Sequence, residues 1–307
     1  MPECSFMTKP AQIPYMTPAF EVEVEAGAVY AVRDGYWSQG SSSGPQLSQV
    51  ALWRHPLELK ADIYSPKGDR SENRPLLLMM HGGSFLFGNR EETGQAAWCR
   101  HFASLGYVAV SIDYRLGFWP SKHGLLQAEA DALDDADSAL AYLLGRTDLR
   151  IDPKRVFAAG TSAGAILAMG LAYSLYGACP PKGSQPRLGP DFRICAVGDL
   201  WGYVRDLAVL ENACVPILAF QSEQDPVVPF DSGYPMNAKA FSDEVYGTRA
   251  TCERAEELGI RCSLHPCPEK RHRLHMDKDG TLTPRFDEIR DAMTVFFAEA
   301  MTQTQKA

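Results

Sequence analysis

Long apolar runs are missing from this chain. No stretch approaches the roughly 18 consecutive apolar residues that a membrane-spanning helix requires, so we expect no transmembrane segment. The first 30 residues also lack a basic segment followed by an apolar core, the pattern of a signal peptide. We therefore expect a soluble protein that is cytoplasmic by default, or secreted if a leader has been removed.

Clustered positive charge is missing as well. Acidic residues outnumber Lys and Arg by 38 to 30, and no run of basic residues stands out. Because nucleic-acid binding depends on clustered positive charge, nucleic acid is not an expected partner. Hydrophobic residues make up 45% of the 307 residues, which is enough for a substantial core.

The spacings that mark common metal sites do not occur. The chain contains no C-x-x-C and no H-E-x-x-H pattern. If residues 261–267 form a strand, Cys262 and Cys267 point to opposite faces about 16 Å apart, at roughly 3.3 Å per residue, which is too far for a disulfide. We expect no metal, and we expect most of the eight cysteines to be buried thiols. The potential ligands closest in sequence are Cys262, His265, Cys267, His272 and His275.

Apolar runs rich in Val, Ile and Leu alternate with longer helical patterns from about residue 76 onward. This alternation is typical of β-α-β units and a parallel sheet. Residues 57–64 alternate apolar and polar side chains, which predicts an antiparallel strand with one wet face. We expect one doubly wound α/β domain over 1–307, with 1–30 as an extended arm. The expected strands are 76–80, 108–112, 156–159, 194–197, 217–220 and 261–267, and the expected helices are 93–105, 125–144, 163–173, 248–258 and 286–301.

The pattern Gly-x-Ser-x-Gly occurs twice in the chain. Around Ser162 it runs from Gly160 to Gly164, directly after the expected strand 156–159 and at the start of an expected helix. This is the context of a nucleophile elbow, in which small residues let a strained backbone project the serine hydroxyl. The match around Ser42 has no expected strand before it and no expected helix after it. Ser162 is therefore the predicted nucleophile, with a plain helix N-cap as the alternative role.

A glycine-rich turn follows another expected strand. His81, Gly82, Gly83 and Ser84 come directly after residues 76–80, where backbone amides can face an oxyanion. The amides of Gly83, Ser84 and Ala163 are the candidate oxyanion donors. An ordinary Gly-Gly turn, braced by His81, is the alternative interpretation.

Together these motifs resemble the carboxylesterase-like esterase/lipase branch of the α/β-hydrolases. The resemblance covers residue 57 to the end. It implies an α/β-hydrolase fold with a mostly parallel sheet of about eight strands and helices on both faces, and a triad in the order Ser, Asp or Glu, His. It also implies chemistry that needs no metal or organic cofactor. The motifs that carry it are His81-Gly-Gly-Ser-Phe85, Asp113-Tyr-Arg-Leu116 and Gly160-Thr-Ser-Ala-Gly164.

This order places the acid of the triad after Ser162. Asp225 follows the expected strand 217–220 and precedes Val-Val-Pro229, which resembles the acid loop of the family. Glu223 and Asp231 are the alternative acids. A plain Asp-Pro turn is the other role open to Asp225.

Three histidines are candidates for the base. His265 lies inside an expected strand, where a structural role is favoured. His272 and His275 lie in the following loop, and His272 aligns better with the Glu-Gly-x-Gly-His-like loop of related esterases, although this chain lacks the glycines. We predict His272 as the base and keep His275 as the alternative.

The expected cleft is open. Asp225 follows Ser162 by only 63 residues, so little chain remains for a helical cap, and the loop 177–191, the arm or the segment 231–246 could roof the site. Aromatic residues follow several strands and either line a pocket or pack loops on the sheet; they are Phe85, Phe87, Phe118, Trp119, Trp201 and Tyr203.

These observations favour a serine carboxylic ester hydrolase of the carboxylesterase type. The expected substrates are short-acyl or aromatic esters, including feruloyl or acetyl groups on polysaccharides, or polyesters. A peptidase or amidase would share every triad feature and is the first alternative. A hydrolase-like binding protein without catalysis is the second.

Overall fold

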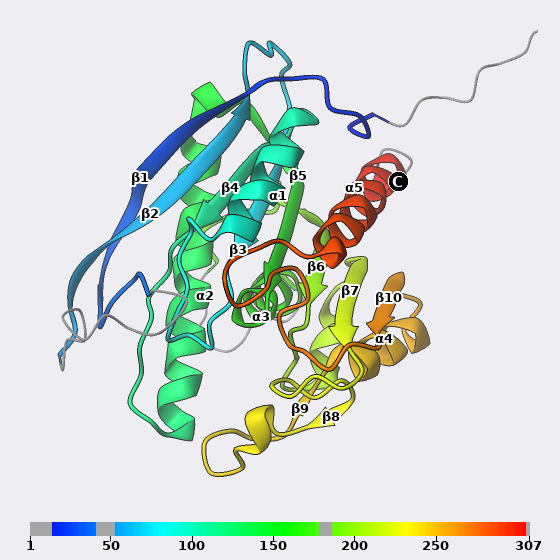
Figure 1. The fold of residues 1–307 in the computed structure, drawn as a ribbon. Coiled ribbons are helices and arrows are strands. Elements are labelled where there is room, and N and C mark those ends of the chain that lie inside the picture. Colours follow the sequence, from blue (N-terminus) through cyan, green and yellow to red (C-terminus); the bar gives the residue numbers. More distant parts are fainter. Residues whose placement is uncertain (1–13, 41–52, 178–185, 305–307) are drawn as a thin grey trace, which may run out of the picture.

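An eight-stranded sheet forms the centre of the structure (Figure 1). This computed structural model describes residues 14–40, 53–177 and 186–304. The strands of the sheet are β1 (Val22–Gly35), β2 (His55–Pro66), β3 (Arg74–Met80), β4 (Val108–Ile112), β5 (Ile151–Thr161), β6 (Ile194–Leu200), β7 (Ile217–Ser222) and β10 (Cys262–Cys267). Their order is β1-β2-β4-β3-β5-β6-β7-β10. Pairing is antiparallel at β1–β2 and β2–β4 and parallel elsewhere, which confirms the predicted mostly parallel sheet.

Helices cover both faces of this sheet (Figure 1). The helices α1 (Thr93–Ser104) and α5 (Pro284–Thr304) pack on one face, and α2 (Lys122–Gly145), α3 (Ala163–Met169) and α4 (Thr248–Glu257) pack on the other. Side chains of the central strand β3 contact helices on both faces of the sheet. Leu76, Leu78 and Met80 pack toward α2 and α3, whereas Leu77 and Met79 pack toward α1 and α5, as the alternation of side chains along a strand requires.

The expected arm at 1–30 is corrected by the structure. From Val22 onward it forms the long edge strand β1, paired antiparallel with β2. Most of its side chains are exposed or half-buried, so no apolar run marked it in the sequence. Tyr30 is an exception, because its buried hydroxyl donates to the Asp113 carbonyl at 2.6 Å. Residues 1–13 lie outside the described part of the chain, as does the second Gly-x-Ser-x-Gly match at Ser42.

The expected helix 163–173 has two parts. Regular α3 ends at Met169, and a π-helical turn, Gly170–Leu175, continues it. Short 3-10 turns lie at Thr147–Leu149, Leu207–Asn212 and Pro235–Asn237. The two-residue strands β8 (Ser232–Gly233) and β9 (Val245–Tyr246) form a small ribbon at one end of the sheet, shown in yellow in Figure 1.

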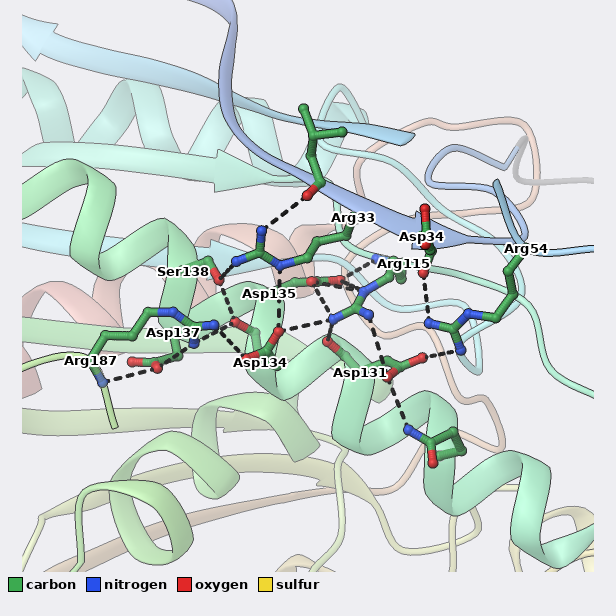
Figure 2. A network of polar contacts seen from close by, with 12 residues as sticks. Arg33, Asp34, Arg54, Arg115, Asp131, Asp134, Asp135, Asp137, Ser138 and Arg187 are labelled. Atoms are coloured by element: carbon green, nitrogen blue, oxygen red, sulfur yellow. Dashed lines mark hydrogen bonds and ion pairs between the residues drawn. The ribbon is translucent and has the colours of Figure 1, made fainter. Parts of the chain in front are cut away.

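Arginine side chains from several segments converge on the acidic face of α2 (Figure 2). Arg115, which follows β4, contacts fully buried Asp135 at 2.7 Å. Arg187 contacts Asp137, also at 2.7 Å, and Asp134 is shared by both arginines. A buried arginine–carboxylate pair with several hydrogen bonds fixes geometry closely, so this network holds α2 against the sheet.

One cysteine pairing differs from the expectation of buried thiols. Cys252 on α4 and Cys262 on β10 form a disulfide, with their Cα atoms 5.5 Å apart. The predicted separation of Cys262 from Cys267 agrees with their positions at opposite ends of β10. The link joins the last strand of the sheet to the helix that precedes it.

The described residues contain no helix that is both long and apolar enough to cross a membrane.

Candidate functional site

Ser162 occupies a strained turn between β5 and α3. Its backbone adopts φ 52° and ψ −115°, an unusual conformation for a residue other than glycine. Its side chain caps no amide of α3, which argues against the plain N-cap role. The turn needs small neighbours, because a Cβ atom on Gly164 would lie 2.0 Å from the Met80 carbonyl oxygen. The local sequence thus permits a turn in which the Ser162 hydroxyl is available for other contacts.

The structure brings the three predicted triad residues together. His272 Nε2 lies 2.8 Å from Ser162 Oγ. On the other side of the ring, His272 Nδ1 lies 2.8 Å and 3.0 Å from the two carboxylate oxygens of Asp225. The Asp225 side chain is fully buried, and that of His272 is 14% exposed. A continuous line of hydrogen bonds therefore joins a buried carboxylate to a serine hydroxyl.

Asp225 is held by backbone amides after β7. Its Oδ1 accepts hydrogen bonds from Val227 N at 2.8 Å and Val228 N at 3.1 Å. Gln221 donates to the Val228 carbonyl at 2.9 Å and accepts from Thr248 Oγ1 at 2.8 Å. No local pattern in the sequence marks Gln221, because its role depends on the contact between β7 and the start of α4.

The alternative acids lie elsewhere. Glu223 is exposed, and Asp231 forms an ion pair with Arg249 on the surface. Within the described part of the chain, neither forms a hydrogen bond or ion pair with His272. Asp225 is the carboxylate that reaches the ring.

Arginine contacts order the loop that carries His272. The loop connects β10 to α5, and Figure 1 shows it in orange, reaching toward α1. Arg271 donates to the backbone carbonyls of Arg273 at 2.7 Å and Met276 at 2.8 Å, and it binds Asp277. These bonds stabilise the loop without the glycines of the resembled family.

His275 occupies a different environment from His272. Its ring is stacked between Trp98 and Trp201, with centroid distances of 5.0 Å and 5.3 Å. Only 1% of the residue is exposed, and neither ring nitrogen has a hydrogen-bond partner among the described residues. Burial, aided by the positive charges of Arg273 and Arg271, lowers the pKa of His275 to about 3. His275 is thus a neutral, packed ring.

His265 also lies apart from Ser162. Its ring stacks on Phe220 at a centroid distance of 4.2 Å. Its Nε2 pairs with Ser263 Oγ at 3.1 Å. His265 is half-buried on β10, which agrees with the structural role expected of a histidine inside a strand.

The predicted oxyanion donors lie beside Ser162. Gly83 and Ser84 have positive φ angles of 120° and 55°, and a Cβ atom on Gly83 would lie 2.2 Å from the Phe87 carbonyl oxygen. Ser84 and Ala163 line the same cavity as Ser162. Gly83 and Ser84 also line a second cavity together with Ser162, so their role as oxyanion donors stays a prediction.

His81 stabilises this glycine-rich turn through hydrogen bonds and ring stacking. Its Nδ1–H donates to the Gly82 carbonyl at 2.7 Å, and its ring stacks on Tyr114 at a centroid distance of 4.3 Å. The Tyr114 hydroxyl donates to the His81 carbonyl at 2.7 Å. Burial lowers the pKa of His81, so the ring stays neutral and supports the loop through packing.

Two cavities meet at Ser162. The first, about 300 Å³, has mostly apolar walls, which include Phe85, Phe118, Ile166, Tyr203, Val228 and Phe241. The second, about 250 Å³, is lined by glycines of the turn and by polar groups, which include Glu92, His272, Arg273 and His275. Of the expected aromatic residues, Trp119 instead faces solvent. Phe241 and Met236 show that the segment 231–246, one of the three segments that could roof the site, forms part of the wall of the first cavity.

No group of three or more His, Cys, Asp or Glu side chains in the described ranges is arranged to hold a metal ion. Cys262 is bonded to Cys252, and His272 is bound to Ser162 and Asp225. With these partners, the potential ligands that lie close together in the sequence do not share one site.

Comparison with protein families gives a match to part of the chain. Residues 61–204, slightly under half of the chain, match the sequence model of the family described as BD-FAE. This range includes the turn at His81 and the elbow at Ser162.

The curated relatives are much longer proteins. The non-reducing polyketide synthase ausA of Emericella nidulans is 42% identical over 125 residues, 39% of this chain and 5% of that protein. The non-reducing polyketide synthase adrD of Penicillium roqueforti is 36% identical over 140 residues, 44% of this chain and 6% of that protein. The chain thus spans only a small part of the length of these relatives.

Solved structures share the fold over nearly the whole chain. Esterase 2 of Thermogutta terrifontis, phosphorylated by paraoxon, superimposes with a TM-score of 0.61 at 20% identity, covering 91% of this chain and 94% of that one. The butyrate-bound form of the same esterase gives a TM-score of 0.59 at 19% identity, with the same coverage. Together with the strand order, this likeness shows that the chain has the α/β-hydrolase fold.

Proposed function

We propose that this protein is a serine carboxylic ester hydrolase that works through an acyl-enzyme. The observation that carries the proposal is the line of hydrogen bonds from Asp225 through His272 to Ser162, with 2.8 Å from His272 to each neighbour. Nucleophile, base and orienting acid within hydrogen-bond reach are the signature of this chemistry.

Each residue has a defined role in the reaction. His272 Nε2 takes the hydroxyl proton as Ser162 Oγ attacks the ester carbonyl carbon, and the amides of Gly83, Ser84 and Ala163 stabilise the resulting oxyanion. When the tetrahedral intermediate collapses, the bond to the leaving oxygen breaks and His272 returns the proton to it. Between these two proton transfers, Asp225 stabilises the positively charged imidazolium of His272. Water, deprotonated by His272, then attacks the acyl-enzyme and releases the acid.

The apolar cavity supports a small or aromatic acyl group. Its volume of about 300 Å³ is at the lower end of the range for ligand pockets, and Phe85, Phe118 and Phe241 line it. A long acyl chain would have to extend past the rim. Esters of acetic, butyric or hydroxycinnamic acids are therefore the proposed substrates, whether free or attached to a polymer.

The identity to polyketide synthases favours a second candidate substrate. A polyketide-derived ester would also place an apolar, often ring-containing acyl group in this cavity. The reaction and the residues stay the same, so the two candidates differ only in the acyl group. Comparing butyrate, cinnamate and aromatic polyketide esters of one alcohol separates them.

Steady-state hydrolysis tests the proposed function directly. We expect the wild type to hydrolyse p-nitrophenyl butyrate, and we expect Ser162→Ala and His272→Ala to lower kcat by at least about 1,000-fold. A matched anilide tests the amidase alternative and should react far more slowly. Comparable wild-type and Ser162→Ala rates, or a preference for the anilide, would refute the proposal.

A further inference from the structure

The position of His272 distinguishes the two cavities at Ser162. His272 lines the second cavity and is absent from the lining of the first. In ester cleavage the imidazole must give its proton to the leaving oxygen, so the leaving group departs on the His272 side. The apolar cavity then receives the acyl group, and the second cavity receives the alcohol.

Polar side chains of both charges line this second cavity. Glu92, the residue before α1, makes no capping bond with the helix and instead forms an ion pair with Arg273. The Glu92 side chain is only 16% exposed. An arginine has five N–H donors and a carboxylate about four acceptor sites, so one pairing leaves donors and acceptors available to a ligand.

His275 adds a third polar group to the same wall. It lines the second cavity, and its two ring nitrogens have no partner among the described residues. Buried polar atoms normally find a hydrogen-bond partner. A neutral imidazole offers one donor and one acceptor, the pair of functions that a hydroxyl group can satisfy.

We propose, on the basis of the ester-hydrolase function above, that the second cavity binds the alcohol part of the substrate and selects a neutral polyol. The charges of Glu92 and Arg273 cancel, so the wall offers no net charge to attract an ionic alcohol. Hydroxyl groups both donate and accept, and they match a wall that carries a guanidinium, a carboxylate and an imidazole. Glu92 and Arg273 determine specificity for the leaving group.

A pair of butyrate esters isolates this preference. Propyl butyrate and glyceryl 1-monobutyrate have the same acyl group and a three-carbon leaving group, and they differ by two hydroxyls. We expect the wild type to favour the glyceryl ester by about tenfold in kcat/KM, the worth of one or two net hydrogen bonds. Equal values for the two esters, with p-nitrophenyl butyrate still hydrolysed, would overturn the inference.

Two variants and one control locate the preference. Glu92→Gln and Arg273→Met should each bring the ratio of kcat/KM close to one, whereas Glu91→Gln, at an exposed neighbouring position, should leave it unchanged. The ion pair also supports the His272 loop, but a displaced His272 would slow both esters alike, so the ratio reports recognition alone. Variants that keep the wild-type ratio would contradict the assignment. If the wild type hydrolyses none of the three esters, the ester-hydrolase proposal itself fails.

Discussion

At the scale of single residues, the two neighbouring histidines of one loop have different roles. His272 contacts Ser162 and Asp225, while His275 is packed between Trp98 and Trp201. We expect His275→Ala to retain hydrolysis of p-nitrophenyl butyrate, because its nitrophenyl leaving group has no hydroxyl for the imidazole of His275 to bind. The same variant should lower the free energy of unfolding by about 3 kcal/mol, because a buried ring is removed. Urea denaturation measures this loss, with His265→Ala as the half-buried control. An inactive, fully stable His275→Ala variant would make His275 the base.

A second residue-scale prediction concerns Asp199 on β6. It is fully buried; Oδ1 accepts from Gly202 N at 2.8 Å, and Oδ2 has no partner among the described residues. Burial raises the pKa of Asp199 to about 6. Because the folded state then holds the proton more tightly than the unfolded chain, Asp199 lowers stability as the pH rises from about 4 through 6.

Asp199→Asn removes this titration. The difference between the free energies of unfolding of Asp199→Asn and the wild type should be larger at pH 8 than at pH 5. The expected increase is about 1 to 2 kcal/mol, at roughly 1.4 kcal/mol per pKa unit. Denaturation of both proteins at the two pH values gives the difference. A difference that does not change with pH would contradict the raised pKa.

At the scale of elements, helix α2 depends on its buried ion pair. Asp135 is fully buried against Arg115, and removing one partner would leave the other charge buried alone. We expect Asp135→Asn to lower the free energy of unfolding by about 3 kcal/mol. Asp287→Asn on α5 removes an exposed carboxylate, 60% of whose side chain is accessible, and should cost less than about 1 kcal/mol. Similar losses in the two variants would show that the α2 network adds little.

Elements buried on both faces could be predicted from the sequence, and edge elements could not. Strand β4 was predicted at its observed bounds because each of its five residues is buried. Strand β1 was missed because few of its side chains are buried. Ser162 was predicted from its place between an expected strand and an expected helix, whereas Asp225 and His272 were predicted from the triad order and loops of the resembled family. Gln221, Glu92 and Arg273 depend on contacts between distant segments, and no local pattern marks such contacts.

At the scale of the whole molecule, we expect buried and half-buried histidines to control stability in acid. Burial lowers the pKa of His275 to about 3 and that of His101 to about 4, and it also lowers that of His81. The unfolded chain binds protons at these positions below about pH 6.5, so their contribution to stability is lost as the pH falls below this value. For His275 alone the loss between pH 7 and pH 5 is about 2 kcal/mol.

The contribution of Asp199 to the free energy of unfolding increases as the pH falls toward 5, but the contributions of several histidines decrease over the same range. We expect the free energy of unfolding to fall by at least about 2 kcal/mol between pH 7 and pH 5, because the losses from His275 and His101 exceed the gain from Asp199. Thermal or urea unfolding across this range measures the change. Stability that stays constant or increases toward pH 5 would show that these histidines are protonated in the folded state.

The central claim is that Ser162 is a nucleophile activated by His272, and covalent labelling tests it most directly. A fluorophosphonate probe should attach to the folded wild type, and mass spectrometry of its peptides should locate the adduct on Ser162. We expect no adduct in Ser162→Ala, strongly slowed labelling in His272→Ala, and labelling retained in His275→Ala. An adduct on another residue, or labelling that persists in Ser162→Ala, would contradict it.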